Sequence, residues 1–157
     1  MFQKYKCVSS FRMKNYVKGL VLWVIVAGFV TIGACKKNND RVPTVAVDEY
    51  LNLNLPEYVE LNAINNWVYY NYAGNRGLII VRTSPSDFAA FERTCTYDPN
   101  VSTAYVVGIP NDIFCIDSTC MSKFSVIDGS VVSGPATTPL LEYRTELLAN
   151  NILHIYN

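Results

Sequence analysis

The chain has 157 residues, half of them hydrophobic, and its 13 basic side chains are balanced by 13 acidic ones. This length allows one domain of ordinary size together with a targeting segment, and the apolar fraction is sufficient for a core. Apart from the N-terminus, no stretch concentrates charge of either sign, which argues against a nucleic-acid partner.

Residues 1–35 follow the pattern of a secretory signal peptide. Five lysine or arginine residues precede an apolar run at residues 19–32, as is typical of exported proteins. The run ends in Ile-Gly-Ala-Cys at residues 32–35, which resembles a bacterial lipobox. We therefore expect a lipoprotein in which the Cys35 thiol carries the lipid and Cys35 becomes the first residue of the mature protein.

An uncleaved transmembrane anchor is the alternative for this segment, since residues 19–35 nearly span a bilayer about 30 Å thick. The run is short for a span and stops at a cleavable motif, which favours the lipoprotein. Met13 is a second candidate start that would give a leader of more usual length. Either form places the following domain in the cell envelope, attached to a membrane and facing the periplasm or the cell exterior.

Residues 36–46 begin with a polar run and contain Pro43, so we interpret them as a tether to a folded domain at residues 47–157. The domain is rich in valine and isoleucine, and the chain has 11 tyrosines. Turn residues recur at short intervals. This composition predicts an all-β domain, a small sandwich or barrel, rather than a helical one.

Strand signals follow one another along this domain. Residues 45–55 alternate between apolar and polar side chains as a half-buried strand does, up to Pro56. Two hairpin turns are indicated most clearly, at residues 73–76 and at Asp128-Gly129, because glycine and asparagine tolerate positive φ. Further strands are expected at residues 67–72, 77–82, 88–93, 104–107, 113–116, 124–127, 130–132, 141–145 and 152–156.

Two cysteine-bearing segments lie on neighbouring hairpins, Cys95-Thr96-Tyr97 and residues 117–124, and Gly134-Pro135-Ala136 follows them. They resemble the cluster-binding loops of Rieske-type iron–sulfur proteins, which read Cys-x-His and Cys-x-x-His-Gly-Ser-x-Phe/Tyr beneath a Gly-Pro-Ala loop. The resemblance covers residues 47–157. It implies the Rieske fold, an antiparallel β-sandwich with a small cluster-binding subdomain inserted at residues 94–136.

The four positions that hold the cluster in that family carry Cys95, Tyr97, Asp117 and Cys120 in this chain. A Rieske centre needs two thiolates on one iron and two imidazoles on the other. The chain has one histidine, His154, and it lies outside both segments. We therefore expect no cofactor, no metal ligand and no catalytic residue. A [2Fe–2S] cluster held by Cys95, Cys120 and substitute ligands is the alternative.

Three cysteines remain in the domain once the leader and Cys35 are set aside, so one of them has no partner. Exported cysteines are normally oxidised, and in the Rieske arrangement the positions of Cys95 and Cys120 lie across one small site. The resemblance thus implies a Cys95–Cys120 disulfide where the cluster would be. Cys115, in an apolar run, is then expected to be a buried and inert thiol.

Other arrangements of the thiols stay open. Cys120 has Cys115 as a second candidate disulfide partner, five residues away in the sequence. A redox-active disulfide is a further alternative, although the chain has no Cys-x-x-Cys motif. A metal such as zinc is also an alternative, with ligands drawn from Cys95, Cys115, Cys120 and either Asp117 or Tyr97.

The sequence as a whole predicts a non-enzymatic structural or binding module, lipid-anchored at the envelope, whose partner is another envelope protein. An electron-transfer protein with substitute cluster ligands is the alternative. A surface adhesion or glycan-utilisation accessory is a third hypothesis, suggested by the lipobox and the many tyrosines. His154 is expected to be structural, since it shares a strand face with Ile152 and Tyr156.

Overall fold

The computed structural model describes residues 41–157. The predicted signal peptide, the lipobox with Cys35 and most of the tether lie outside the described residues. The described part contains ten strands and two short 3-10 helices, which confirms the predicted all-β class. Among residues 41–157, no helix combines the length and the apolar character that a membrane span needs.

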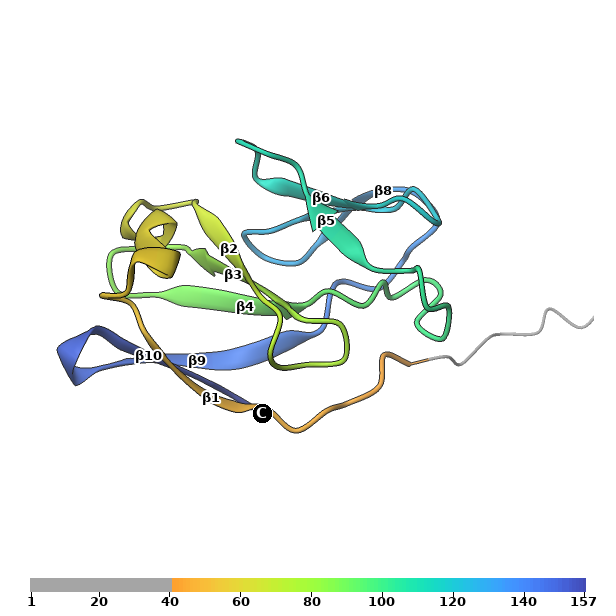
Figure 1. Cartoon of the computed structure of the whole chain (residues 1–157). Helices are drawn as coiled ribbons and strands as arrows, with labels where there is room; N and C mark the ends of the chain where they lie inside the picture. Colours follow the sequence, from red (N-terminus) through yellow and green to blue (C-terminus); the bar gives the residue numbers. More distant parts are fainter. Residues whose placement is uncertain (1–40) are drawn as a thin grey trace, which may run out of the picture. The chain divides into compact units, whose positions relative to one another are not determined.

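Six strands form one antiparallel sheet in the order β1-β10-β9-β4-β3-β2 (Figure 1). One 3-10 helix, η1 (Pro56–Asn62), connects β1 to β2, and a second, η2 (Ala149–Asn151), turns β9 into β10. Because β1 pairs with β10, the first and last strands of the domain lie side by side. The six strands are β1 (Asp48–Asn52), β2 (Trp67–Tyr70), β3 (Leu78–Arg82), β4 (Phe88–Glu92), β9 (Glu142–Leu148) and β10 (Ile152–Tyr156).

A second antiparallel sheet of four strands is formed by consecutive segments of the chain, β5-β6-β7-β8 (Figure 1). In sequence it is inserted between β4 and β9, which are themselves paired in the larger sheet. The small sheet therefore lies within residues 94–136, the range in which the resemblance implied an inserted subdomain. Its strands are β5 (Val106–Gly108), β6 (Phe114–Asp117), β7 (Lys123–Ser125) and β8 (Val131–Ser133).

Strand β3 is buried on both faces and belongs to two hydrophobic cores. Leu78 and Ile80 pack into a core with β1, β10 and η1. The alternate residues Ile79 and Val81 pack into a second core with side chains of the small sheet. Successive side chains of a strand point to opposite faces, so a continuous apolar run is required here rather than an alternating one. The same division holds in β4, where Phe88 and Ala90 face the first core.

The predicted hairpins are present. Strands β2 and β3 pair antiparallel around the turn at residues 73–76, and β7 pairs with β8 around Asp128-Gly129. Gly129 has a φ of 70°, which glycine adopts without steric cost. Asn150 and Asn151, between β9 and β10, also have positive φ values, 62° and 61°. Local turn chemistry was therefore a sound guide to the strand pairing.

The prediction of one strand across residues 45–55 was wrong in extent. The strand β1 covers only Asp48–Asn52, and Pro56 begins helix η1 instead of simply ending a strand. Proline suits the first turn of a helix, where its missing N–H has no helical partner to lose. Tyr58 and Leu61 are buried because their three-residue spacing places both on one face of a 3-10 helix.

Candidate functional site

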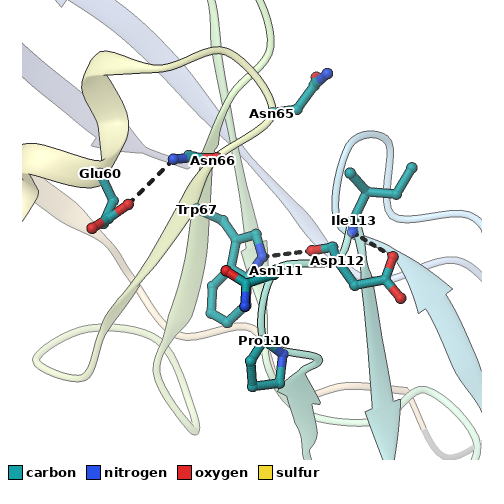
Figure 2. A pocket seen from close by; sticks show the side chains of 8 residues that line it. All are labelled: Glu60, Asn65, Asn66, Trp67, Pro110, Asn111, Asp112 and Ile113. Atoms are coloured by element: carbon teal, nitrogen blue, oxygen red, sulfur yellow. Dashed lines mark hydrogen bonds between the residues drawn. The ribbon is translucent and has the colours of Figure 1, made fainter.

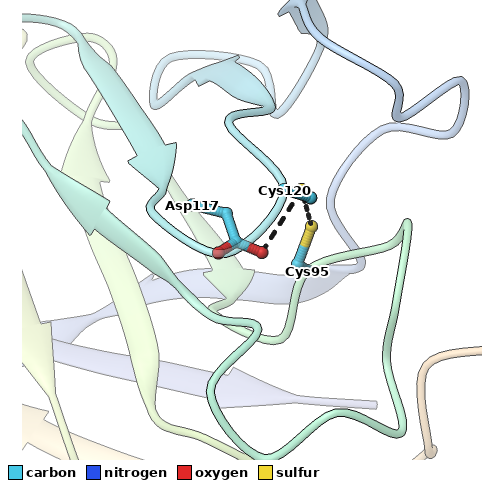
Figure 3. A group of neighbouring side chains, drawn as sticks. All are labelled: Cys95, Asp117 and Cys120. Atoms are coloured by element: carbon cyan, nitrogen blue, oxygen red, sulfur yellow. Dashed lines mark hydrogen bonds between the residues drawn. The ribbon is translucent and has the colours of Figure 1, made fainter.

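Cys95 and Cys120 lie next to each other although 25 residues separate them in the sequence (Figure 3). Cys95 belongs to loop one (residues 93–105), between β4 and β5, and Cys120 belongs to loop two (residues 118–122), between β6 and β7. Their Sγ atoms are 3.4 Å apart. Cys95 is fully buried, whereas Cys120 is partly exposed. Of the two residues, Cys120 is therefore the one that reaches the surface.

Asp117 is the third member of this site (Figure 3). It is the last residue of β6 and is fully buried. Its Oδ1 accepts a hydrogen bond of 2.7 Å from the backbone N–H of Thr119, and its Oδ2 lies 3.4 Å from the Cys120 Sγ. The two sulfurs and a carboxylate oxygen all lie within 4.8 Å of one another, so the site offers a compact set of two soft ligands and one hard ligand.

Loop two is closed tightly by its own backbone. The Asp117 N–H donates to the Ser122 carbonyl at 2.9 Å, and the Met121 N–H donates to the Asp117 carbonyl at 2.8 Å. Met121 adopts a φ of 62° to complete the turn. The Ser122 hydroxyl oxygen is 3.0 Å from the Cys120 Sγ and accepts the Ala136 N–H at 3.1 Å. These bonds set the position of Cys120 on the small sheet.

Loop one is held at its start by the buried carboxylate of Glu92, the last residue of β4. Its Oε1 accepts the backbone N–H and the hydroxyl of Thr94 at 3.0 and 2.8 Å. Oε1 also accepts the backbone N–H of Arg76 at 2.9 Å. The other oxygen, Oε2, accepts the backbone N–H of Asn75 at 2.7 Å and the hydroxyl of Tyr143 at 3.1 Å. Cys95 directly follows Thr94, so this network fixes the point from which the thiol extends.

The cover segment, Gly134-Pro135-Ala136, lies against loop two. Gly134 has a φ of 101°, and a Cβ at this position would be 2.5 Å from the Ser122 Cα. This distance is far inside van der Waals contact, and the backbone conformation is one that side-chain-bearing residues rarely adopt. Only glycine therefore allows the cover segment to approach the turn that carries Cys120.

Replacing Gly134 with alanine is expected to lower the free energy of unfolding by about 2 kcal/mol or more, because strain and the clash with Ser122 add together. Chemical denaturation measures the loss. The neighbouring Ser133→Ala exchange is the control, since Ser133 is exposed and its side chain makes no hydrogen bond within residues 41–157. Equal stability of the two variants would contradict the close approach of the cover segment.

Burial makes two of the three thiols poor nucleophiles. It raises the pKa of the Cys95 thiol, and the Asp117 carboxylate beside it raises that pKa further. Burial raises the pKa of Cys115 to about 12. Cys115 lies in the second hydrophobic core and does not belong to the ligand group formed by the described residues. It has the surroundings that the sequence analysis expected of an inert thiol.

The raised pKa of Cys115 predicts a loss of stability in alkali. The unfolded thiol ionises near its ordinary pKa of 9.0, whereas the folded thiol stays protonated up to about 12. The contribution is therefore complete below pH 9.0 and falls as the pH rises toward the folded pKa. By about pH 10 the loss amounts to about 1.4 kcal/mol. Chemical denaturation of the wild type and of Cys115→Ala below pH 9.0 and at about pH 10 measures the effect. The free energy of unfolding should fall less with pH in the variant than in the wild type. Equal falls would contradict the raised pKa of Cys115.

Tyr97 and His154 were the other residues considered as ligands in the sequence analysis. The Tyr97 side chain is about half exposed. The His154 Nε2 lies 2.7 Å from Asp48 Oδ1, and its ring stacks between Tyr50 and Tyr156. These positions do not fit a Rieske cluster, which needs two imidazoles on one iron. The described residues supply two thiols and a carboxylate instead.

Sequence reasoning missed Glu92 and Ser122 as residues that position the site. A glutamate that ends an otherwise apolar strand, Phe-Ala-Ala-Phe-Glu, was the one available signal. A scan against protein-family models found no match for the chain, and a search of curated proteins found none either. Its function is therefore inferred from the site.

Proposed function

We propose that this protein is a lipid-anchored, Rieske-like domain of the cell envelope in which a Cys95–Cys120 disulfide joins loop one to loop two. On this proposal the domain is not an enzyme. It acts as a structural or binding module for another envelope protein, and the disulfide occupies the place where related proteins hold a cluster. The observation that carries the proposal is the 3.4 Å distance between the two Sγ atoms.

Two features of the fold support the Rieske-like assignment. The small sheet is inserted between the paired strands β4 and β9, in agreement with the subdomain that the resemblance implies at residues 94–136. The cover segment, Gly134-Pro135-Ala136, packs on loop two through Ser122. In Rieske proteins a Gly-Pro-Ala loop covers the cluster loops in the same order along the chain.

Forming the disulfide requires only a small movement. The sulfurs must approach from 3.4 Å to a bond length of about 2.05 Å. The two thiols release two protons and two electrons, and a protein disulfide of the envelope accepts the electrons and is reduced to a dithiol. The Cys120 sulfur attacks the partner's disulfide and forms a mixed disulfide with it. The Cys95 sulfur then attacks the Cys120 sulfur, and the partner leaves with both of its sulfurs reduced to thiols.

Peptide mapping by mass spectrometry without reduction tests the bond. The full chain is exported in its native host, alkylated and digested, and the expected product is one linked peptide pair containing Cys95 and Cys120, with Cys115 alkylated after denaturation. Recovery of Cys95 and Cys120 as free thiols, or a bridge from either of them to Cys115, would remove the proposal. Metabolic lipid labelling of the wild type and of Cys35→Ser tests the anchor separately, and label should be lost only in the variant.

A zinc site is the second candidate, favoured by the carboxylate beside the thiol pair. Tetrahedral zinc with bonds of about 2.3 Å to sulfur and 2.1 Å to oxygen places its ligand atoms about 3.5 to 3.8 Å apart. The Cys120 Sγ lies 3.4 Å from both the Cys95 Sγ and the Asp117 Oδ2. Reduced protein titrated with zinc without oxygen should then bind one ion, and Asp117→Asn should bind it much more weakly.

The electron-transfer alternative makes a different prediction for the protein as isolated. A [2Fe–2S] cluster would bring two irons per chain and absorption in the visible range. Metal analysis and a visible spectrum of protein purified without added metal separate the three candidates. The disulfide-linked module should contain neither iron nor zinc in stoichiometric amount.

A further inference from the structure

A pocket lies apart from the thiol pair, where the loop before β2 meets the hairpin loop between β5 and β6 (Figure 2). Its volume is about 450 Å³, within the range of sites for small ligands. Trp67, the first residue of β2, forms part of its wall. Polar side chains from both loops line the same pocket. The pocket thus lies between a loop of the large sheet and a loop of the small sheet.

The indole ring is held rigidly. Its Nε1–H donates to the Asp112 carbonyl at 2.9 Å. The six-membered ring lies so close to Gly108 that a Cβ there would be 2.3 Å from it, and Tyr69 packs edge-on with ring centroids 5.0 Å apart. A ligand that stacks on this ring therefore meets a surface that needs no ordering when it binds, which favours affinity.

Three asparagines line the pocket together with Trp67, and the side-chain amides of two of them are free to bind a ligand (Figure 2). The exposed side chains of Asn65 and Asn111 form no hydrogen bond within residues 41–157, whereas Asn66 donates to the Glu60 carboxylate at 3.2 Å. Both unused residues have positive φ, 69° and 58°, so their backbones are committed to tight turns. Each amide presents a donor and an acceptor side by side.

The charges in the pocket limit the class of ligand. Its two ionisable side chains, Glu60 and Asp112, are both acidic, and no cation lines it. Anionic ligands are therefore disfavoured. Each carboxylate accepts one hydrogen bond, from Asn66 and from the Ile113 backbone N–H respectively, and each keeps a second oxygen that can accept a hydrogen bond from a ligand hydroxyl. An uncharged ligand with many hydroxyl groups fits best.

We propose that this pocket binds a neutral saccharide. The C–H groups on one face of a sugar ring pack on the electron-rich face of the Trp67 indole, as aromatic geometry favours. The amides of Asn65 and Asn111 exchange hydrogen bonds with hydroxyls at the rim. This site is separate from the thiol pair, and it would give the proposed binding module a small-molecule ligand.

Trp67 provides a direct signal for binding. It is the one tryptophan after residue 35, since the other, Trp23, lies in the predicted leader. The full chain, purified in detergent, is titrated with neutral tetrasaccharides of glucose, mannose, galactose and N-acetylglucosamine, and the fluorescence is followed. At least one sugar should give a saturable change at millimolar concentration or below. Calorimetry with the same sugar should report one site.

Isosteric variants test the amides. Asn65→Asp and Asn111→Asp keep the size of the side chain but replace its donor with a negative charge, and each should weaken binding about three- to tenfold. Asn150→Asp is the matched control, because Asn150 is also exposed with a φ of 62° but lies in η2, away from the pocket. It should bind the sugar like the wild type.

Three results would overturn the proposal. One is the absence of any change in fluorescence or heat with all four sugars. Another is equal affinity of Asn111→Asp and the wild type, which would place the sugar elsewhere. The third is tighter binding of choline than of any sugar, since choline probes a site that recognises quaternary ammonium through an aromatic ring.

Discussion

Replacing Glu92 with alanine is expected to lower the free energy of unfolding by about 4 kcal/mol or more, because several buried donors lose their acceptor at once. The Glu92 carboxylate accepts five hydrogen bonds, including those from the Thr94 hydroxyl and the Tyr143 hydroxyl. Glu92 is fully buried, so water cannot replace the lost acceptor without opening the structure. Chemical denaturation measures the loss.

Two comparison variants make this prediction sharper. Glu92→Gln keeps the shape and one oxygen, so about half of the loss is expected from it. Glu146→Ala removes a glutamate that is exposed on β9 and makes no side-chain hydrogen bond within residues 41–157, and it should change stability by less than about 0.5 kcal/mol. If Glu92→Ala were as mild as Glu146→Ala, the buried network would have no energetic weight. Loop one would then need another explanation for its position.

Reducing the proposed Cys95–Cys120 disulfide is expected to lower the free energy of unfolding by about 3.5 kcal/mol in the loop-entropy model. The bond closes a loop of 25 residues, and its loss lets the unfolded chain gain conformational freedom. For a domain of this size the melting temperature should fall by roughly 10 to 20 °C. Thermal unfolding followed by circular dichroism, with and without a reductant, measures the effect.

Single cysteine variants show which thiols carry that effect. Cys95→Ala and Cys120→Ala should each abolish the response to the reductant. Cys115→Ala should keep the full response although its core is altered, because Cys115 lies outside the site. If the response disappeared in Cys115→Ala and persisted in Cys95→Ala, the disulfide would involve Cys115 and the proposed Cys95–Cys120 pairing would be wrong. A wild type that melts at the same temperature in both conditions would show that no such bond is present.

The local chain chemistry determined most of the strand pairing. Glycine and asparagine at the hairpin turns, as at Asp128-Gly129, admit the positive φ that a tight reversal needs, whatever lies around them. The apolar run of β3 was equally legible as a strand. It did not reveal that Ile79 and Ile80 pack into different hydrophobic cores. The second face of the strand is covered by the small sheet, which comes from another part of the chain.

The candidate site depended on the tertiary structure to a greater degree. The sequence alone established that the domain has three cysteines and one histidine, and hence that a two-thiolate, two-imidazole cluster has no full ligand set. Only the fold placed Cys95 beside Cys120 and turned Asp117 toward them. The reason is physical: side-chain types are written in the chain, but contact between residues 25 apart depends on how two loops are held. The buried bonds of Glu92 and Ser122, from distant partners, hold them.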